Sequence, residues 1–87
     1  MYYFEFDNKK SCSNRHKHGI DFVESQELWN DSSFIKIQAK SDNEPRFLIV
    51  GCIADKHWSA VITYRGDTIR IISVRRSRKK EVELYES

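Results

Sequence analysis

The sequence predicts an α+β domain in which an antiparallel sheet packs against a helical hairpin. Three observations lead to this prediction. The chain opens on a short aromatic segment of strand character, two helix-start signals follow within the first third, and the apolar residues then repeat with a period of two from residue 33 to residue 74. The predicted order is β-α-α-β-β-β-β-α, which favours two layers with the hairpin over the apolar face of the sheet.

A strand and a helix are expected before residue 20. Tyr3–Phe6 is aromatic and partly alternating, as short strands are. Asp7 can then accept hydrogen bonds from the free amides at the start of a helix over Asn8–His18. Gly19 suits the left-handed residue that follows many helices.

A second helix is expected to bury most of the apolar surface of the hairpin. Asp21 provides the start signal, and Glu24 three residues later completes a capping-box pattern. The helix should end near Asn30. Its apolar face comprises Phe22, Ser25, Leu28 and Trp29.

Four further strands are expected to form a meander, with the N-terminal strand along one edge. They are Phe34–Lys40, Arg46–Ala54, His57–Tyr64 and Thr68–Val74, separated by polar turns. The second of them is apolar almost throughout, which predicts burial on both faces. Gly51 within it indicates a bulge or a close approach of other backbone. The tail Arg78–Glu86 returns to a helical pattern.

Size and composition indicate one folded domain over residues 1–87. The 13% of aromatic residues argues against disorder, and no apolar run approaches the roughly 20 residues of a membrane helix. The acidic, aromatic N-terminus is unlike a signal peptide. Cys12 and Cys52 form no CxxC and no zinc spacing. We therefore expect free buried thiols and a cytoplasmic protein, with a disulfide between the two cysteines as the alternative.

The net charge of +2 conceals an uneven distribution. Residues 1–31 carry four Lys or Arg and six Asp or Glu, a net −2, whereas residues 65–87 carry seven and four, a net +3. Five of those seven form one run, which consists of Arg75, Arg76, Arg78, Lys79 and Lys80. Such a block is either solvated, here at the start of a helix, or matched to an anion or an acidic partner.

Motifs at both ends of the chain resemble those of the BrnT family of toxins. Near the N-terminus they are Phe4-Glu5-Phe6-Asp7, Lys10, Asn14, Lys17-His18-Gly19 and Phe22, followed by Asp31. Near the C-terminus they are Thr63–Ser73, Arg75-Arg76, Glu81 and Tyr85. The resemblance is weakest over residues 33–43. The departures are Phe6 where Trp is common, Asn8 where Pro is common and Val74 where Ala is common, and none of them removes a group that could do chemistry.

The resemblance implies a fold similar to RelE-type toxins, a ribonuclease activity that inhibits translation, and a BrnA-like antitoxin. It also implies that this antitoxin carries a ribbon-helix-helix domain, so that operator DNA is bound only through the antitoxin. No cofactor and no membrane contact are expected. Because the sequence offers no carboxylate and histidine set with metal-ligand spacing, we expect metal-independent cleavage. Such cleavage needs a base, an acid and cations beside the developing phosphorane charge.

Arginines are the candidates for stabilising that charge. Arg75 and Arg76 end the last strand and should point to opposite faces, so that one could clamp a phosphate; a salt bridge at the helix start is the alternative. Arg65 is expected in a turn, where it is either functional or solvated. Arg70, in mid-strand, should contact RNA or a cross-strand carboxylate. Since Arg65 and Arg75 flank the last strand, roughly 30 Å apart, one would grip the scissile phosphate and the other would position RNA. The further expected RNA contacts are Lys17, Arg78, Lys79 and Lys80.

His18 and Tyr64 are the candidates for proton transfer. Imidazole is the side chain best suited to exchange a proton near neutral pH, which makes His18 a candidate, and its alternative role is to interact with the C-terminal end of the first helix. Tyr64 could donate a proton or stack on a base, and its alternative role is packing. Two other classes of function stay open: a non-catalytic module that binds nucleic acid, and a subunit that only binds the antitoxin.

Overall fold

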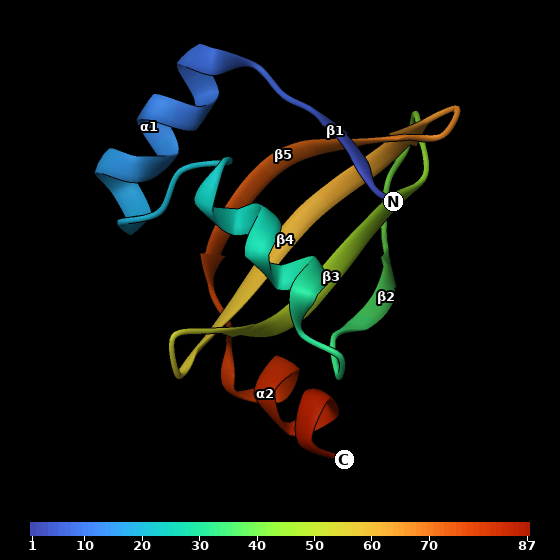
Figure 1. Cartoon of the computed structure of the whole chain (residues 1–87). Coiled ribbons are helices and arrows are strands. Elements are labelled where there is room, and N and C mark those ends of the chain that lie inside the picture. Colours follow the sequence, from blue (N-terminus) through green and yellow to red (C-terminus); the bar gives the residue numbers. More distant parts are fainter.

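A five-stranded sheet dominates the structure, a computed structural model that describes residues 1–87 (Figure 1). The elements in chain order are β1 (Tyr3–Glu5), α1 (Asn8–His18), the 3₁₀ helix η1 (Glu24–Asn30), β2 (Ile35–Ala39), β3 (Arg46–Ile53), β4 (Lys56–Arg65), β5 (Thr68–Arg76) and α2 (Lys79–Glu86). The strand order is β1-β5-β4-β3-β2, with β1 parallel to β5 and every other pair antiparallel. The α+β class and the meander with the N-terminal strand at one edge are confirmed.

The main core lies between η1 and one face of the sheet, called here the covered face (Figure 1). Alternate side chains of each strand point to this face. Three adjacent strands contribute Ile49, Ala60 and Val74, which lie opposite one another and are buried. The helical segment contributes Phe22, Leu28 and Trp29, which are also buried. The prediction that these three residues pack the segment onto the sheet is confirmed.

The second helix was expected to be an α-helix, and this expectation is wrong, because η1 is a 3₁₀ helix. Asp21 Oδ1 does accept hydrogen bonds from the amides of Val23 and Glu24, but the Gln26 amide bonds to the Val23 carbonyl three residues earlier. The Glu24 carboxylate turns to Arg15 at 2.6 Å instead of returning to Asp21, so no capping box forms. The residues Phe22, Ser25 and Leu28 are all buried and recur every three positions, which matches the three residues per turn of a 3₁₀ helix.

Asn14 joins α1 to the edge of β5. The short strand β1 pairs only with Thr68–Arg70, so the rest of that edge has no neighbouring strand. The buried Asn14 side chain takes its place: its Nδ2 donates to the carbonyl of Val74 at 2.8 Å and its Oδ1 accepts from the Val74 amide at 3.1 Å. Nδ2 also donates to the Ile20 carbonyl at 2.8 Å. The side chain thus holds three backbone groups that would otherwise be buried without partners.

The predicted ends of α1 are confirmed, whereas three smaller expectations change. Asp7 accepts from the first amides of the helix, and Gly19 has a φ of +80°. Arg65, however, is the last residue of β4 and pairs with Thr68, so it does not belong to the turn. Burial of β3 is complete only at its centre, over residues 49–51. Both cysteines are free, as expected, but Cys12 is exposed.

Gly51 marks a close approach, but the atoms that approach it belong to side chains and not to the backbone, as one of the two alternatives had expected. A Cβ built there would lie 3.2 Å from Asp31 Oδ2 and 3.2 Å from Leu28 Cδ2, so the loop after η1 could not pack against a larger residue. The irregularity of the sheet lies elsewhere, in β5, where Ile72 has no partner in the register with β4. Bulges of this kind often lie beside functional sites.

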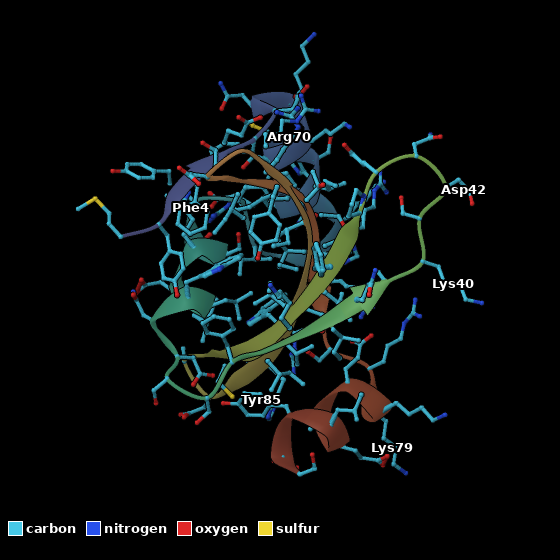
Figure 2. The ribbon with its side chains drawn as sticks, turned by 90° about the vertical axis from the view of Figure 1, so that its right-hand side faces the viewer. Phe4, Lys40, Asp42, Arg70, Lys79 and Tyr85 are labelled. Carbon is cyan, nitrogen blue, oxygen red and sulfur yellow. The ribbon has the colours of Figure 1, made fainter.

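The opposite face of the sheet, called here the open face, has no helix over its middle. In Figure 2, η1 lies on one side of the sheet and α2 lies below one end. Half-buried apolar residues of the open face are Ile37, Leu48 and Val61, which lie opposite one another on β2, β3 and β4. Figure 2 also shows Arg70 and Lys79 at opposite ends of the molecule. The open face is therefore an accessible surface with basic residues at both ends.

Candidate nucleic-acid interface

Arg75 and Glu81 form a closed ion pair at the α2 end of the open face. Both guanidinium nitrogens of the fork lie 2.8 Å from a carboxylate oxygen, and the Arg75 side chain is 24% exposed. Glu81 also accepts hydrogen bonds from the Ser59 hydroxyl and the Arg78 amide. The hydrogen bonds from Arg75 lower the pKa of Glu81 to about 2, although burial opposes the shift. Arg75 therefore makes the salt bridge at the helix start, and a carboxylate occupies the position that a phosphate would need.

The other basic residues of this end make no ion pair. Arg76 points to the covered face, as the alternation predicted, with its guanidinium carbon 5.5 Å from the ring centre of Trp58. Its Nε donates to the His57 carbonyl at 3.2 Å. Arg78, Lys79 and Lys80 are exposed around the start of α2. The α2 end thus presents four cations without carboxylate partners beside the closed pair.

Three arginines and the Glu5 carboxylate occupy the opposite end of the open face, and Asp7 lies close enough to Arg70 for the two charges to attract. Arg70 Nη1 lies 2.7 Å from Glu5 of β1, which is the cross-strand ion pair considered as its alternative role. Arg65 Nε lies 3.9 Å from the same carboxylate, and its side chain is 57% exposed. Arg46, at the start of β3, has a buried Nε without a hydrogen-bond partner. The positive charge here exceeds the negative charge of Glu5.

A cleft between α1 and β5 brings His18 and Lys17 together. It has a volume of about 180 Å³ and is lined by Lys10, Ser13, Asn14, Lys17, His18, Ile72 and Ser73. Neither lysine nor the histidine forms an ion pair, and no carboxylate lines the cleft. The bulged residue Ile72 forms part of its wall. An anion entering this cleft would meet two ammonium groups and an imidazole, while the Asp7 carboxylate outside the lining lies close enough to Lys10 for the two charges to attract.

A wider hollow of about 520 Å³ lies along the loop after β2, lined by Gln38–Asp42. It is formed by one continuous segment, and Lys40 there stands beside Asp42 in the lining. It therefore lacks the convergence of cations from separate elements that the smaller cleft has.

Tyr64 lies apart from the arginines of its end. Its side chain points to the covered face beyond η1, where its ring meets Phe47 edge-on with the ring centres 5.4 Å apart. Lys36 Nζ lies 5.2 Å from the centre of the Tyr64 ring and 3.4 Å from its hydroxyl. Arg65, the next residue, points to the open face by alternation. The two side chains therefore do not converge on one group.

Asp31 connects η1, β3 and α2 through one carboxylate. It accepts hydrogen bonds from the amides of Ser33 and Cys52 at 2.9 and 2.8 Å and from the Tyr85 hydroxyl at 2.6 Å. Burial raises the pKa of Asp31, but the hydrogen bonds from Tyr85, Ser33 and Cys52 outweigh it and hold the pKa below its ordinary value. The hydrogen bond between the Tyr85 hydroxyl and Asp31 also raises the pKa of Tyr85. Tyr85 and Asp31 therefore anchor α2.

His57 meets the Tyr85 ring edge-on, with the ring centres 5.3 Å apart, which fits a packing role for His57.

The structure gathers the expected site residues into three separate groups. His18 and Lys17 share the cleft, Arg65 and Arg70 share Glu5, and Arg75 lies at the far end of β5. Sequence reasoning missed Lys10 and Arg46 as members of the first two groups. Lys10 lies seven residues before Lys17, two helical turns on the same face, and this spacing could have indicated it. Arg46 could have been noticed as the charged residue that opens an apolar strand.

The chain matches the model of a known protein family. Residues 6–81 match the family described as the ribonuclease toxin, BrnT, of type II toxin-antitoxin systems. This chain belongs to the BrnT family. Membership implies ribonuclease activity, an RNA target and an antitoxin partner. No curated protein matches the chain.

Two further features bear on the class of protein. No group of three or more His, Cys, Asp or Glu side chains lies close enough to hold a metal ion. No helix is long and apolar enough to cross a membrane.

Proposed function

We propose that this BrnT-family chain is a cytoplasmic endoribonuclease that cuts RNA without a metal ion and thereby inhibits translation. The observation that carries the proposal is the cleft between α1 and β5. There a titratable imidazole and two lysines line a polar cavity without a carboxylate. A metal-independent ribonuclease needs a group that can exchange a proton near neutral pH together with fixed positive charge. Within the proposal, the sheet serves as a RelE-like scaffold for this chemistry.

In the proposed reaction His18 removes the proton of a ribose 2′-hydroxyl, and the 2′-oxygen forms a bond to the adjacent phosphorus. The bond from phosphorus to the 5′-oxygen of the next nucleotide breaks. That oxygen takes up a proton from the protonated His18 or from water, which leaves a 2′,3′-cyclic phosphate and a 5′-hydroxyl. Lys10 and Lys17 stabilise the charge on the pentacoordinate phosphorus, where fixed cations contribute most.

The arginines have positioning roles in this proposal. Arg65 and Arg70 contact the RNA on the open face, and Arg65 is the more available because its only carboxylate contact is long. Arg75 can hold a phosphate only when Glu81 leaves it, and Arg76 points to the other face. Both are therefore assigned to RNA positioning at the α2 end, with Arg78, Lys79 and Lys80. Tyr64, with Lys36 beside its ring, is assigned to stacking on a base.

The partner in this proposal is a BrnA-like antitoxin with a ribbon-helix-helix domain, which brings the complex to operator DNA. An acidic or amphipathic segment of the antitoxin would cover residues 75–80, because four cations there lack carboxylate partners. Covering this surface would also block the RNA that approaches it.

A non-catalytic RNA-binding subunit is the second candidate. The observation that favours it is that a single imidazole lines the cleft, whereas a separate acid and base would normally be expected. A subunit of this kind would bind RNA and the antitoxin but would produce no new RNA ends.

The reaction class can be tested with purified protein and two single strands of one sequence. One strand is RNA, and the other carries deoxyribose throughout. We expect cleavage of the RNA alone, products that end in a 2′,3′-cyclic phosphate, and an unchanged rate in excess EDTA. Cleavage of the deoxyribose strand would contradict the proposed use of the 2′-hydroxyl. A rate abolished by EDTA and restored by a divalent cation would contradict metal independence.

A further inference from the structure

Arg46, Arg65 and Arg70 come from three different strands but share the open face. In the register of β3 and β4, Phe47 lies opposite Ile62, so the next step along the strands places Arg46 opposite Thr63. Thr63 in turn lies opposite Arg70. The Thr63 hydroxyl donates to the Pro45 carbonyl at 2.6 Å, which holds the start of β3 against β4 at this point. Strands in a sheet are about 4.8 Å apart, so Arg46 and Arg70 are about 10 Å apart at the backbone, and their long side chains can reach one ligand.

The charge of this group is incompletely matched. Glu5 is the carboxylate that pairs with Arg70 and, at longer range, with Arg65. Arg46 forms no ion pair, and its Nε is buried without an acceptor. A buried donor of a charged group without a partner costs stability. Features of this kind in a folded protein require an explanation, and one explanation is a ligand that supplies the acceptor.

We propose that Arg46, Arg65 and Arg70 bind one phosphate group of the RNA backbone, as a site separate from the cleft between α1 and β5. The identity of the ligand rests on the proposed function, which makes RNA the substrate. Arginine forks suit phosphate oxygens, and Glu5 holds Arg70 in place while leaving the group with a net positive charge. The Arg46 guanidinium supplies donors that no protein acceptor has taken.

The two sites lie along one strand. Arg70 and the cleft residue Ser73 are both on β5, three residues apart, or roughly 10 Å at the rise of a strand. A single RNA strand that places one phosphate in the cleft can therefore place a neighbouring phosphate on the arginine site. The arginine site fixes the register of the RNA, and the cleft carries out the chemistry.

Binding can be tested separately from cleavage with a 2′-O-methyl RNA oligonucleotide, which lacks the nucleophile. Fluorescence anisotropy over a range of salt concentrations would give the affinity and its salt dependence for the wild type, Arg46→Gln and Arg65→Gln. Arg15→Gln is the matched control, because Arg15 is an exposed arginine on α1 that is paired with Asp21 and Glu24. We expect each of the first two substitutions to weaken binding about tenfold and to reduce the salt slope by about 1. The control should stay within about twofold of the wild type.

Thermal unfolding separates a binding role of Arg46 from a structural one. If the orphaned Nε exists for a ligand, Arg46→Met, which has no N–H donor at this position, should unfold at the same temperature as the wild type or higher, because a buried unpartnered donor is removed. Weaker RNA binding together with a lower unfolding temperature would assign Arg46 to the fold and overturn its part in the site. Arg65→Gln, an exposed position, then tests the site without that complication.

Other outcomes of the binding experiment also test the proposed phosphate site. Unchanged affinity in both Arg46→Gln and Arg65→Gln, or an equal loss in Arg15→Gln, would overturn the site. So would a wild type that does not bind the oligonucleotide. If these variants instead lost affinity for the antitoxin and kept it for RNA, the arginines would bind carboxylates of the partner protein. Loss of binding in a protein that cleaves no RNA would support the site while contradicting the proposed catalysis.

Discussion

Single polar side chains hold several backbone segments of this small fold at once. Asn14 satisfies the backbone of β5 and of the segment after α1, and Asp31 accepts hydrogen bonds from the loop after η1, from β3 and from α2. Both residues belong to the motifs that resemble the BrnT family, and the structure gives each a structural reason. Glu81 has a comparable role, because it binds Arg75, Ser59 and the amide of Arg78.

The ion pair of Glu81 predicts how stability depends on pH. The pKa of Glu81 falls from 4.5 to about 2 on folding, so its contribution is complete above pH 4.5 and is lost as the pH falls towards 2. Protonation in that range removes the bidentate partner of Arg75. We expect the unfolding temperature of Glu81→Gln to lie below that of the wild type at pH 7 and to approach it near pH 2. A difference between the two proteins that stays constant from pH 7 to pH 2 would show that the ion pair does not stabilise the fold.

The elements differ in how firmly they are attached to the sheet. The segment η1 is attached by Leu28 and Trp29, which are buried against strand residues, and Trp29 meets Phe4 edge-on with ring centres 4.9 Å apart. In contrast, α2 has no buried residue and is held mainly by the polar contacts of Glu81 and Tyr85. The helix is therefore the element that a partner protein could most easily displace or cover.

Removing the Trp29 side chain tests the attachment of η1. We expect Trp29→Ala to lower the free energy of unfolding by about 3–5 kcal/mol, because a large buried aromatic leaves a cavity. Urea denaturation would measure the change, with the exposed Val23→Ala as the control, for which a change below about 0.5 kcal/mol is expected. Equal stability of Trp29→Ala and the wild type would mean that η1 is packed by other residues.

The sequence predicted the positions of the strands better than the type of the helices. It also identified basic residues of the candidate site better than the residues that they contact. The period of two and the polar turns identified β2, β4 and β5, whereas β3 was identified as an apolar run, in keeping with the burial of Ile49 on the covered face and of Val50 on the open face. The type of η1 was missed because Phe22, Ser25 and Leu28 fit both a three-residue and a 3.6-residue repeat when Trp29 is included. The pairing of Arg75 with Glu81 and the convergence of Lys10 with His18 depend on tertiary contacts, which spacing alone does not give.

Across the whole molecule, positive charge is divided among three regions. They are the arginine group around Glu5, the cleft between α1 and β5, and the α2 end. Arg70 and Lys79, which mark the first and the last, lie at opposite ends in Figure 2. The last strand, β5, spans roughly 30 Å at about 3.3 Å per residue. A single phosphate therefore cannot contact both the arginine group around Glu5 and the α2 end. A long ligand such as RNA could follow the open face between them.

The α2 end predicts an electrostatic contribution to antitoxin binding. We expect neutralisation of Arg76, Arg78, Lys79 and Lys80 by Gln to slow association with the antitoxin at least tenfold at low salt, with a smaller effect at high salt. Arg75 is left intact so that the ion pair with Glu81 persists. Stopped-flow association with the antitoxin of the same operon would measure the rates. Identical rates for the variant and the wild type would exclude this surface from the encounter.

The most direct measurement is the rate of RNA cleavage by His18→Gln compared with His16→Gln. Both histidines are exposed and near the end of α1, but only His18 lines the cleft with Lys10 and Lys17. If His18 transfers the proton, single-turnover cleavage at pH 7 should slow by about 10²–10⁴ in His18→Gln, while His16→Gln cleaves like the wild type. Binding of the 2′-O-methyl oligonucleotide should change little in either variant. Cleavage by His18→Gln at the wild-type rate would contradict the assignment of the chemistry to this cleft.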